Sequence, residues 1–261
     1  MKKLSLSALL LFILSLAHGQ ETDQKYTPQE IYQKASYVCR AETIFEIIGV
    51  DSGGSEVQLS LGDGASCFAV TYNGQKIILT NAHLSQPLIG EINYEVQSPT
   101  GTTQGKLQSI KSVRNLMTLV TFKNSENQYL IAEFQDIDEE KDLAKLRLKK
   151  QKDYERLPTG ILSPSKKIQV GDRVFNIGNP LGHKFAFHTG YISLILPPSA
   201  DEPYRAIITE EMTGPGNSGS PLINESGEVI GINRMYMVIN PHFSRFIHVD
   251  EIKKYLEKTE K

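Results

Sequence analysis

Short apolar runs alternate with turn-forming residues through most of this 261-residue chain. The runs are rich in β-branched and aromatic residues and are bounded by Gly, Asn, Asp and Pro, which is typical of β-strands joined by tight turns. Many short strands at such intervals favour an all-β sandwich or a pair of barrels. Strands are expected at residues 66–72, 76–80, 129–135, 144–148, 173–177, 191–196, 205–208, 221–223 and 229–233.

Helical patterns occur only near the two ends of the body of the chain. Thr27, Pro28 and Glu30 have the order of a capping box with proline at the first helical position, which predicts a short helix there. Near the C-terminus, apolar residues recur at helical spacing in a segment rich in Lys and Glu. This pattern predicts an amphipathic closing helix over about residues 249–258.

The first nineteen residues have the pattern of a secretory signal peptide. Lys2 and Lys3 give a positively charged start, residues 8–16 form a short apolar run, and small residues stand at Ala17 and Gly19. The run is shorter than the roughly 20 apolar residues that a spanning helix needs, and an uncleaved anchor is the alternative. We expect residues 1–19 to be removed and the remainder, 20–261, to be exported to a periplasm or beyond it without a stable membrane anchor.

Charge and cysteine content exclude several classes of function. Lys and Arg number 28, Asp and Glu number 30, and the formal net charge is −2. Because there is no basic excess to hold a phosphate backbone, nucleic acid is not expected as a partner. Only two cysteines are present, without CxxC or HExxH spacing, so neither a metal site nor a cofactor is expected.

Three segments carry residues with catalytic potential. His83 directly follows an apolar strand, Asp142 directly precedes an alternating one, and Ser218 lies in the Gly-rich segment 214–221. Each alone has an ordinary explanation: a surface or satisfied histidine, one acidic residue among several, and a Gly-rich surface turn. Together, in the order His, Asp, Ser, they match the chain order of a chymotrypsin-type triad. Small neighbours around the serine would also let a substrate carbonyl approach.

The motifs around these residues resemble trypsin-like serine proteases of the bacterial HtrA/Deg branch. TNAH, DLAKL and GNSGSP are similar to that branch's His, Asp and Ser blocks, and the resemblance extends over residues 27–256. Further matches are GDRVFNIGNPLG at 171–182, TGYIS at 189–193, GEVIGIN at 227–233 and FIHV at 246–249. The resemblance implies two packed six-stranded antiparallel β-barrels, the first over about residues 36–150 and the second over about 165–248, with the active site between them.

The resemblance also implies a role for each site residue and a polypeptide substrate. Ser218 would be the nucleophile, His83 the general base, and Asp142 the group that orients the imidazole. The backbone of Gly216, Asn217 and Ser218 would form the oxyanion hole, and Asn217 would keep the turn geometry between the two donors. The reaction expected is hydrolysis of peptide bonds in unfolded or extended polypeptides through an acyl-enzyme.

Residues near the expected specificity pocket are Met212, Thr213, Asn233 and Met235. The methionines suggest a flexible apolar pocket, although each is about as well explained as ordinary core. Because the segment offers no aligned aspartate for a basic side chain, cleavage after an uncharged, apolar residue is expected. Glu211 opposes this interpretation, since a carboxylate turned into the pocket would select Arg or Lys.

Family topology would bring Cys39 and Cys67 together, and an exported protein meets oxidising surroundings. A disulfide is therefore expected, with two buried free thiols as the alternative.

Several departures from the family pattern keep other functions open. Ser220 stands where a second glycine is usual, and His83 and Asp142 are 59 residues apart, with the extra length expected in loops between Leu84 and Glu126. No PDZ domain is expected after residue 256. One alternative is a catalytically impaired pseudoprotease that binds peptides, and another is a narrow processing protease. The oligomeric state is not predicted.

Overall fold

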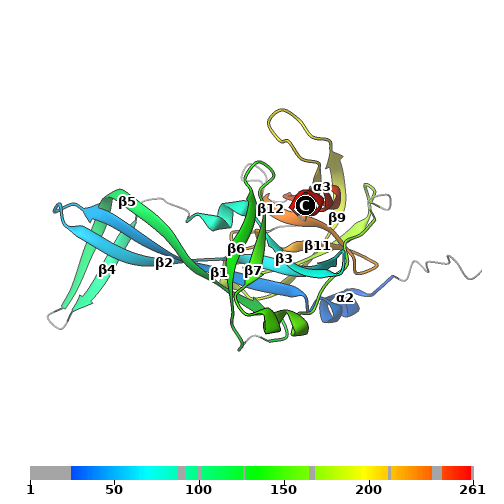
Figure 1. The fold of residues 1–261 in the computed structure, drawn as a ribbon. Coiled ribbons are helices and arrows are strands. Elements are labelled where there is room, and N and C mark those ends of the chain that lie inside the picture. The colour runs from blue at the N-terminus through cyan, green and yellow to red at the C-terminus, as the bar shows by residue number, and fades with distance from the viewer. Residues whose placement is uncertain are drawn as a thin grey trace, which may run out of the picture.

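The computed structural model describes residues 25–87, 92–98, 101–125, 127–164, 168–210, 213–236 and 243–259. Two antiparallel β-barrels pack against each other, which confirms the expected fold class (Figure 1). The predicted signal peptide lies outside the described residues. Within them, no helix combines the length and the apolar composition that crossing a bilayer requires.

The first barrel is a ring of six strands. The sheet order is β1-β2-β3-β7-β6-β5, and pairing of β1 with β5 closes the ring, while β4 pairs only with β5 outside it. The strands are β1 (Val38–Asp51), β2 (Glu56–Tyr72), β3 (Gln75–Thr80), β4 (Asn93–Ser98), β5 (Gly101–Phe122), β6 (Leu130–Asp138) and β7 (Leu143–Leu148).

The second barrel is closed in the order β10-β13-β12-β11-β8-β9. Its strands are β8 (Arg173–Gly178), β9 (Ala186–Leu196), β10 (Ala206–Thr209), β11 (Pro221–Asn224), β12 (Val229–Tyr236) and β13 (Ser244–His248). Short 3-10 turns lie at η1 (Ala82–Ser85), η2 (Gln151–Arg156) and η4 (Pro180–Gly182).

Two short helices flank the barrels, as the sequence predicts. Helix α2 (Pro28–Lys34) begins with a full capping box: the backbone N–H of Glu30 donates to the Thr27 hydroxyl, and the backbone N–H of Thr27 donates to the Glu30 carboxylate at 2.8 Å. Helix α3 (Val249–Thr259) buries one face against the second barrel.

The largest apolar cluster lies between the two barrels. It joins Phe68 and Leu79 of the first barrel to Phe175 and Ile177 of the second, and α2 and α3 add side chains to it. Each of these four side chains is fully buried. Burial of one such side chain contributes roughly 1.5–3 kcal/mol. This shared core fixes the two barrels relative to each other, and therefore fixes residues that meet at their junction.

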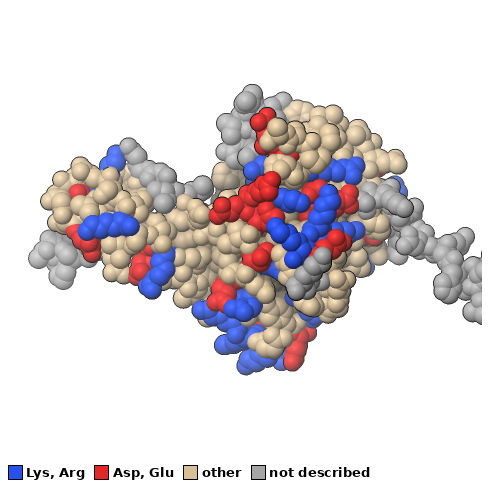
Figure 2. Space-filling model, turned by 45° about the horizontal axis from the view of Figure 1, so that its top comes forward, with Lys and Arg blue, Asp and Glu red and all other residues tan. Residues whose placement is uncertain are grey.

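Strands β1, β2 and β5 continue well beyond the barrel and form, with β4, a projecting arm made of residues 44–63, 93–98 and 101–115 (Figure 1). The space-filling view shows it as a lobe beside the main body (Figure 2). The arm has its own small core, in which Phe45, Ile47 and Leu107 are buried. The expectation that the extra length between Leu84 and Glu126 forms loops is therefore wrong, because most of it forms β4 and β5.

Cys39 and Cys67 face each other across β1 and β2 as direct register partners. Their Cα atoms are 4.9 Å apart and the two residues form a disulfide. The bond lies at the base of the arm, next to the junction of the barrels.

Candidate active site

His83 and Asp142 are held together by several hydrogen bonds. His83 lies in η1, directly after β3, and its ring Nδ1 is 2.9 Å from both carboxylate oxygens of Asp142. The backbone N–H of His83 also donates to Asp142 Oδ1 at 2.9 Å. In addition, the side-chain amide of Asn81 donates to the backbone carbonyl of Asp142 at 2.9 Å. Asp142 has a φ of 56°, a conformation that Asp tolerates better than most residues. The carboxylate thus fixes both the position and the orientation of the imidazole.

Ser218 lies in a loop that presses directly on the first barrel. Gly216 and Gly219 have φ values of 91° and 83°, which glycine adopts without steric cost. A Cβ on Gly219 would lie 2.1 Å from the carbonyl oxygen of Ser66, and one on Gly216 would lie 2.6 Å from that of Asn179. The glycines of the GNSGSP region are therefore required by close backbone contact as well as by the turn.

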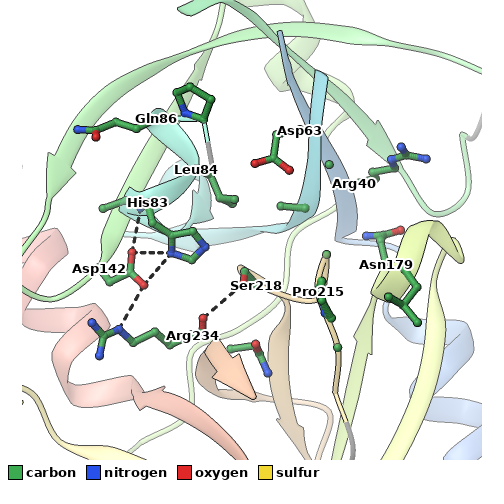
Figure 3. A pocket seen from close by; sticks show the side chains of 18 of the residues that line it. Arg40, Asp63, His83, Leu84, Gln86, Asp142, Asn179, Pro215, Ser218 and Arg234 are labelled. Carbon is green, nitrogen blue, oxygen red and sulfur yellow. Dashed lines mark hydrogen bonds and ion pairs between the residues drawn. The ribbon is translucent and has the colours of Figure 1, made fainter. Parts of the chain in front are cut away.

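Ser218 and His83 line the same cavity, of about 950 Å³, at the junction of the barrels (Figure 3). The Ser218 hydroxyl donates to the carbonyl of Arg234 at 3.3 Å. In the described part of the chain it makes no hydrogen bond to His83. In proteins of this chemistry such a bond often tightens only when substrate is bound, so the geometry is compatible with a nucleophile and its base.

Two backbone donors beside Ser218 are available to an oxyanion. Among the described residues, the N–H groups of Gly216 and Ser218 have no acceptor. The N–H of Asn217 instead donates to the carbonyl of Gly214 at 3.0 Å. The Asn217 side chain is buried and donates to Asn176 at 2.6 Å, so this residue holds the turn together.

Ser66 and Asn179 brace this loop, and sequence reasoning did not assign either to the site. The Ser66 N–H donates to the carbonyl of Ser218 at 2.8 Å, and the Ser66 hydroxyl donates to the carbonyl of Gly216 at 2.9 Å. The backbone N–H of Asn179 donates back to the Ser66 hydroxyl at 2.9 Å. Asn179 belongs to the IGNP motif, and this motif is the one feature of the sequence that could have pointed to a role for Asn179 at the site.

Comparison with known sequences decides the family. The profile described as "Trypsin-like peptidase domain" matches residues 65–232, which include His83, Asp142 and Ser218. The chain belongs to the trypsin-like peptidase family.

Curated relatives of this trypsin-like peptidase are HtrA-type proteins. A probable periplasmic DegP-like serine endoprotease of Halomonas elongata is 33% identical over 184 residues, which cover 69% of this chain and 30% of the relative. The mitochondrial serine protease HTRA2 of Drosophila willistoni is 28% identical over 210 residues, covering 78% of this chain and 40% of the relative. The matched region thus spans less than half the length of these two relatives.

Solved structures support the fold. The HtrA-type protease AlgW, solved with a decapeptide, has a TM-score of 0.64 and 20% sequence identity, over 89% of this chain and 67% of that one.

Arg234 is a site residue of this trypsin-like peptidase that the sequence did not single out. Its Nε lies 3.3 Å from Asp142 Oδ2, and its guanidinium also contacts the hydroxyl and the ring of Tyr204. Figure 3 shows the guanidinium below Asp142, on the side away from the imidazole. No local motif identifies it, because its role depends on a contact between β12 and the turn before β7.

Two acidic side chains besides Asp142, those of Glu139 and Asp63, line the cavity. Asp63 of β2 lines it, and Figure 3 shows its carboxylate directed into the open space. Burial raises the pKa of the Asp63 carboxyl, while the N–H of Gly64 and the charge of His83 act in the opposite direction. In the described residues, no His, Cys, Asp or Glu cluster has the make-up of a metal site.

The structure describes only part of the predicted specificity pocket. Met212 and Glu211 lie outside the described residues, and Met235 lies on β12 with a side chain that is not described. Thr213 and Asn233 are buried next to each other, with 3.4 Å between the Asn233 amide and the Thr213 hydroxyl. A further hydroxyl, that of Ser244, is 2.7 Å from Thr213. The described lining is therefore uncharged but polar.

Ser220 does not share the exposure of Ser218. It is fully buried, and its hydroxyl accepts a hydrogen bond from the Asn176 amide at 2.8 Å. This serine stabilises the loop from the buried side. It is not among the residues that line the cavity.

Proposed function

We propose that the protein is an exported serine endopeptidase that uses His83, Asp142 and Ser218 to cleave unfolded or extended polypeptides. The observation that carries the proposal is the bidentate contact of Asp142 with His83 in the same cavity as Ser218. Membership of the trypsin-like peptidase family and the DegP-like periplasmic relatives support it.

The mechanism follows from which ring nitrogen is free. Because Nδ1 of His83 is engaged by Asp142, Nε2 is left to accept the proton of the Ser218 hydroxyl as its oxygen attacks the peptide carbonyl. The N–H groups of Gly216 and Ser218 receive the resulting oxyanion. His83 then gives the proton to the departing amine, which leaves an acyl-enzyme on Ser218. In the second half of the reaction His83 takes a proton from water as the water oxygen attacks the acyl group, and returns that proton to the Ser218 oxygen as it leaves.

The site suits an extended chain. The cavity is bordered by Asn233 and Arg234 of β12 on one side and by Asp63 and Gly64 of β2 on the other. A polypeptide can bind between such strands through backbone hydrogen bonds, which is a mode of recognition that unfolded segments satisfy. One related HtrA-type structure is described as holding a decapeptide.

A peptide-binding pseudoprotease is the second candidate. One observation favours it: the Ser218 hydroxyl donates to the Arg234 carbonyl and not to His83. A serine held in this way would be unactivated, while the cleft would still accept a peptide.

Labelling with a fluorophosphonate probe separates the two functions. The mature wild type is expected to become covalently labelled, the Ser218→Ala variant to remain unlabelled, and the Ser220→Ala variant to be labelled at a rate close to wild type. Lack of labelling of correctly folded wild type would favour the pseudoprotease. Labelling that persists in Ser218→Ala but is lost in Ser220→Ala would move the nucleophile.

A further inference from the structure

We propose that the outer edge of β2, from Glu56 to Gly64, binds the part of the substrate that follows the scissile bond as an added antiparallel strand. This primed-side segment would leave the active site along the arm. The inference rests on the proposed peptidase function and extends it by naming a second binding surface and the kind of substrate that it favours.

The direction of the backbone groups of β2 is fixed at both ends of the strand. At the base, the N–H of Ser66 donates away from β1 to the carbonyl of Ser218, and the carbonyl of Ser66 accepts from the Thr80 hydroxyl. At the tip, the carbonyl of Ser55 accepts from Asp51 on the β1 side. Because the pairing of β1 with β2 has no register shift, even-numbered residues of β2 direct both N–H and C=O away from β1.

No described strand pairs with this outer edge along the arm. Strand β3 pairs with β2 only over Phe68–Tyr72, and then ends at Thr80. The outward groups of Gly64, Gly62, Ser60, Gln58 and Glu56 therefore have no strand partner in the part of the chain that the structure describes. Natural sheets usually protect such edges with charged side chains, Pro or a bulge. The segment EVQLSLGDG has no Pro and no bulge, and its two charged residues, Glu56 and Asp63, lie near its ends.

The edge is continuous with the catalytic cavity. Asp63 and Gly64 line the cavity together with Ser218, so the outward groups begin beside the nucleophile (Figure 3). Strand β2 runs from the tip of the arm toward the site, so a chain that leaves the site toward the tip runs antiparallel to it (Figure 1). The nine residues from Glu56 to Gly64 span about 30 Å, at roughly 3.3 Å per residue.

Recognition along this edge would depend on length more than on sequence. Gly62 and Gly64 offer no side chain, and Ser60 and Gln58 are exposed on the sheet face. Backbone hydrogen bonds would therefore supply most of the contact, and every second primed residue would make them. We infer that the preferred substrates are polypeptides that continue for many residues beyond the cleaved bond.

Two peptides that differ only in length test this inference. They share every residue up to the second primed position, and one continues for eight further residues. The long peptide is expected to have a higher kcat/KM with wild type. In Ser60→Pro, which removes one outward N–H and leaves the β1 ladder intact, this advantage should fall by about threefold to tenfold. The matched variant Ser60→Ala should keep it, and the short peptide should be cleaved alike by all three proteins.

N-methylated long peptides make the test independent of any variant. Methylation of the residues that face β2 should lower kcat/KM about threefold to tenfold, and methylation of the residues between them should change it less than twofold. Equal cleavage of long and short peptides by wild type, or the lack of this period of two, would overturn the proposal. A different outcome would also overturn it: Ser60→Pro changes the mass measured by sedimentation but keeps the preference for the long peptide. The edge would then bind a second copy of the chain and not the substrate.

Binding to the inactive Ser218→Ala variant separates this inference from the proposed function. Fluorescence anisotropy should show that the long peptide binds at least threefold more tightly than the short one. If wild type is not labelled by the probe and cleaves neither peptide, but the long peptide still binds more tightly, the peptidase proposal fails and the proposal of peptide binding along β2 remains. If wild type cleaves both peptides equally well, the edge proposal fails and the peptidase function remains.

Discussion

Arg234 and His83 bind the same carboxylate oxygen. Oδ2 of Asp142 lies 2.9 Å from Nδ1 of His83 and 3.3 Å from Nε of Arg234. In the proposed mechanism, the positive guanidinium would therefore offset part of the negative charge by which Asp142 stabilises an imidazolium.

Replacing Arg234 should change the pH dependence of turnover. Arg234→Met removes the charge but keeps the backbone carbonyl that receives the Ser218 hydroxyl. We expect the acidic limb of the pH profile of kcat/KM to move to higher pH, by roughly half a pH unit or more. Arg234→Lys keeps a positive charge and should leave the limb nearly unchanged. An acidic limb that moves to lower pH in Arg234→Met would contradict this electrostatic role.

Loss of the Asp142 charge should stop turnover without unfolding the protein. In Asp142→Asn the amide would hold the imidazole in the wrong tautomer, so kcat should fall roughly 10³–10⁴-fold. The nearby Asp138→Asn is the matched control, because the Asp138 side chain accepts a hydrogen bond from the N–H of Lys141 in the adjoining turn. Turnover and circular dichroism spectra of both variants check the prediction. Near-normal turnover in Asp142→Asn with collapse in Asp138→Asn would show that the other carboxylate is the catalytic one.

Cleavage should follow uncharged, apolar residues. Among the described residues of the pocket region, Thr213, Asn233 and Ser244 carry no charge that would attract Arg or Lys. Cleavage-site profiling on a denatured protein mixture should therefore return sites after residues such as Val, Leu, Ala or Met. Predominant cleavage after Arg or Lys, lost in Glu211→Ala, would instead place a carboxylate in the pocket.

Stability should fall in mildly acidic solution because of His248. Burial lowers the pKa of this fully buried imidazole to about 4, and its Nδ1 accepts the N–H of Asp250 at 3.1 Å. An unfolded histidine has a pKa of about 6.5. Between these values the unfolded chain binds a proton that the folded protein does not, so the free energy of unfolding decreases as pH falls from about 6.5 to about 4.

The effect of His248 should amount to roughly 1–3 kcal/mol and can be isolated by substitution. In His248→Asn the side-chain oxygen can still accept from Asp250, and denaturant unfolding at pH 7, 5.5 and 4.5 should show a flatter pH dependence. The exposed His183→Asn should retain the wild-type dependence. The same slope in wild type and His248→Asn would assign the acid sensitivity to other groups.

The three residues of the proposed triad could be predicted from the sequence because each lies in a local motif. His83, Asp142 and Ser218 are bounded by short strands and tight turns whose patterns survive in the sequence. Arg234 and Ser66 carry no such pattern. Each acts through contacts with residues more than 90 positions away, such as the bond from Ser66 to Gly216, and those contacts exist only once the barrels have docked.

The arm escaped sequence reasoning for a different reason. Along β5, Leu107, Ile110, Val113 and Leu116 recur every third residue, whereas a regular strand alternates every second one. Register shifts between β1 and β5 account for this, because each one places an extra residue in β5 and resets which face the next side chain occupies. A bulged strand of this kind therefore does not show the pattern by which strands are recognised.

Because Ser66 holds the loop that carries Ser218, the proposed activity would depend on the packing of the two barrels against each other. Ser66 belongs to the first barrel, yet it bonds to the carbonyls of both Gly216 and Ser218 in the second. Any loosening of the junction would release the loop before either barrel loses its strands. Inactivation by heat or denaturant should then precede loss of β-structure, and a preparation with an intact far-ultraviolet spectrum could already be inert.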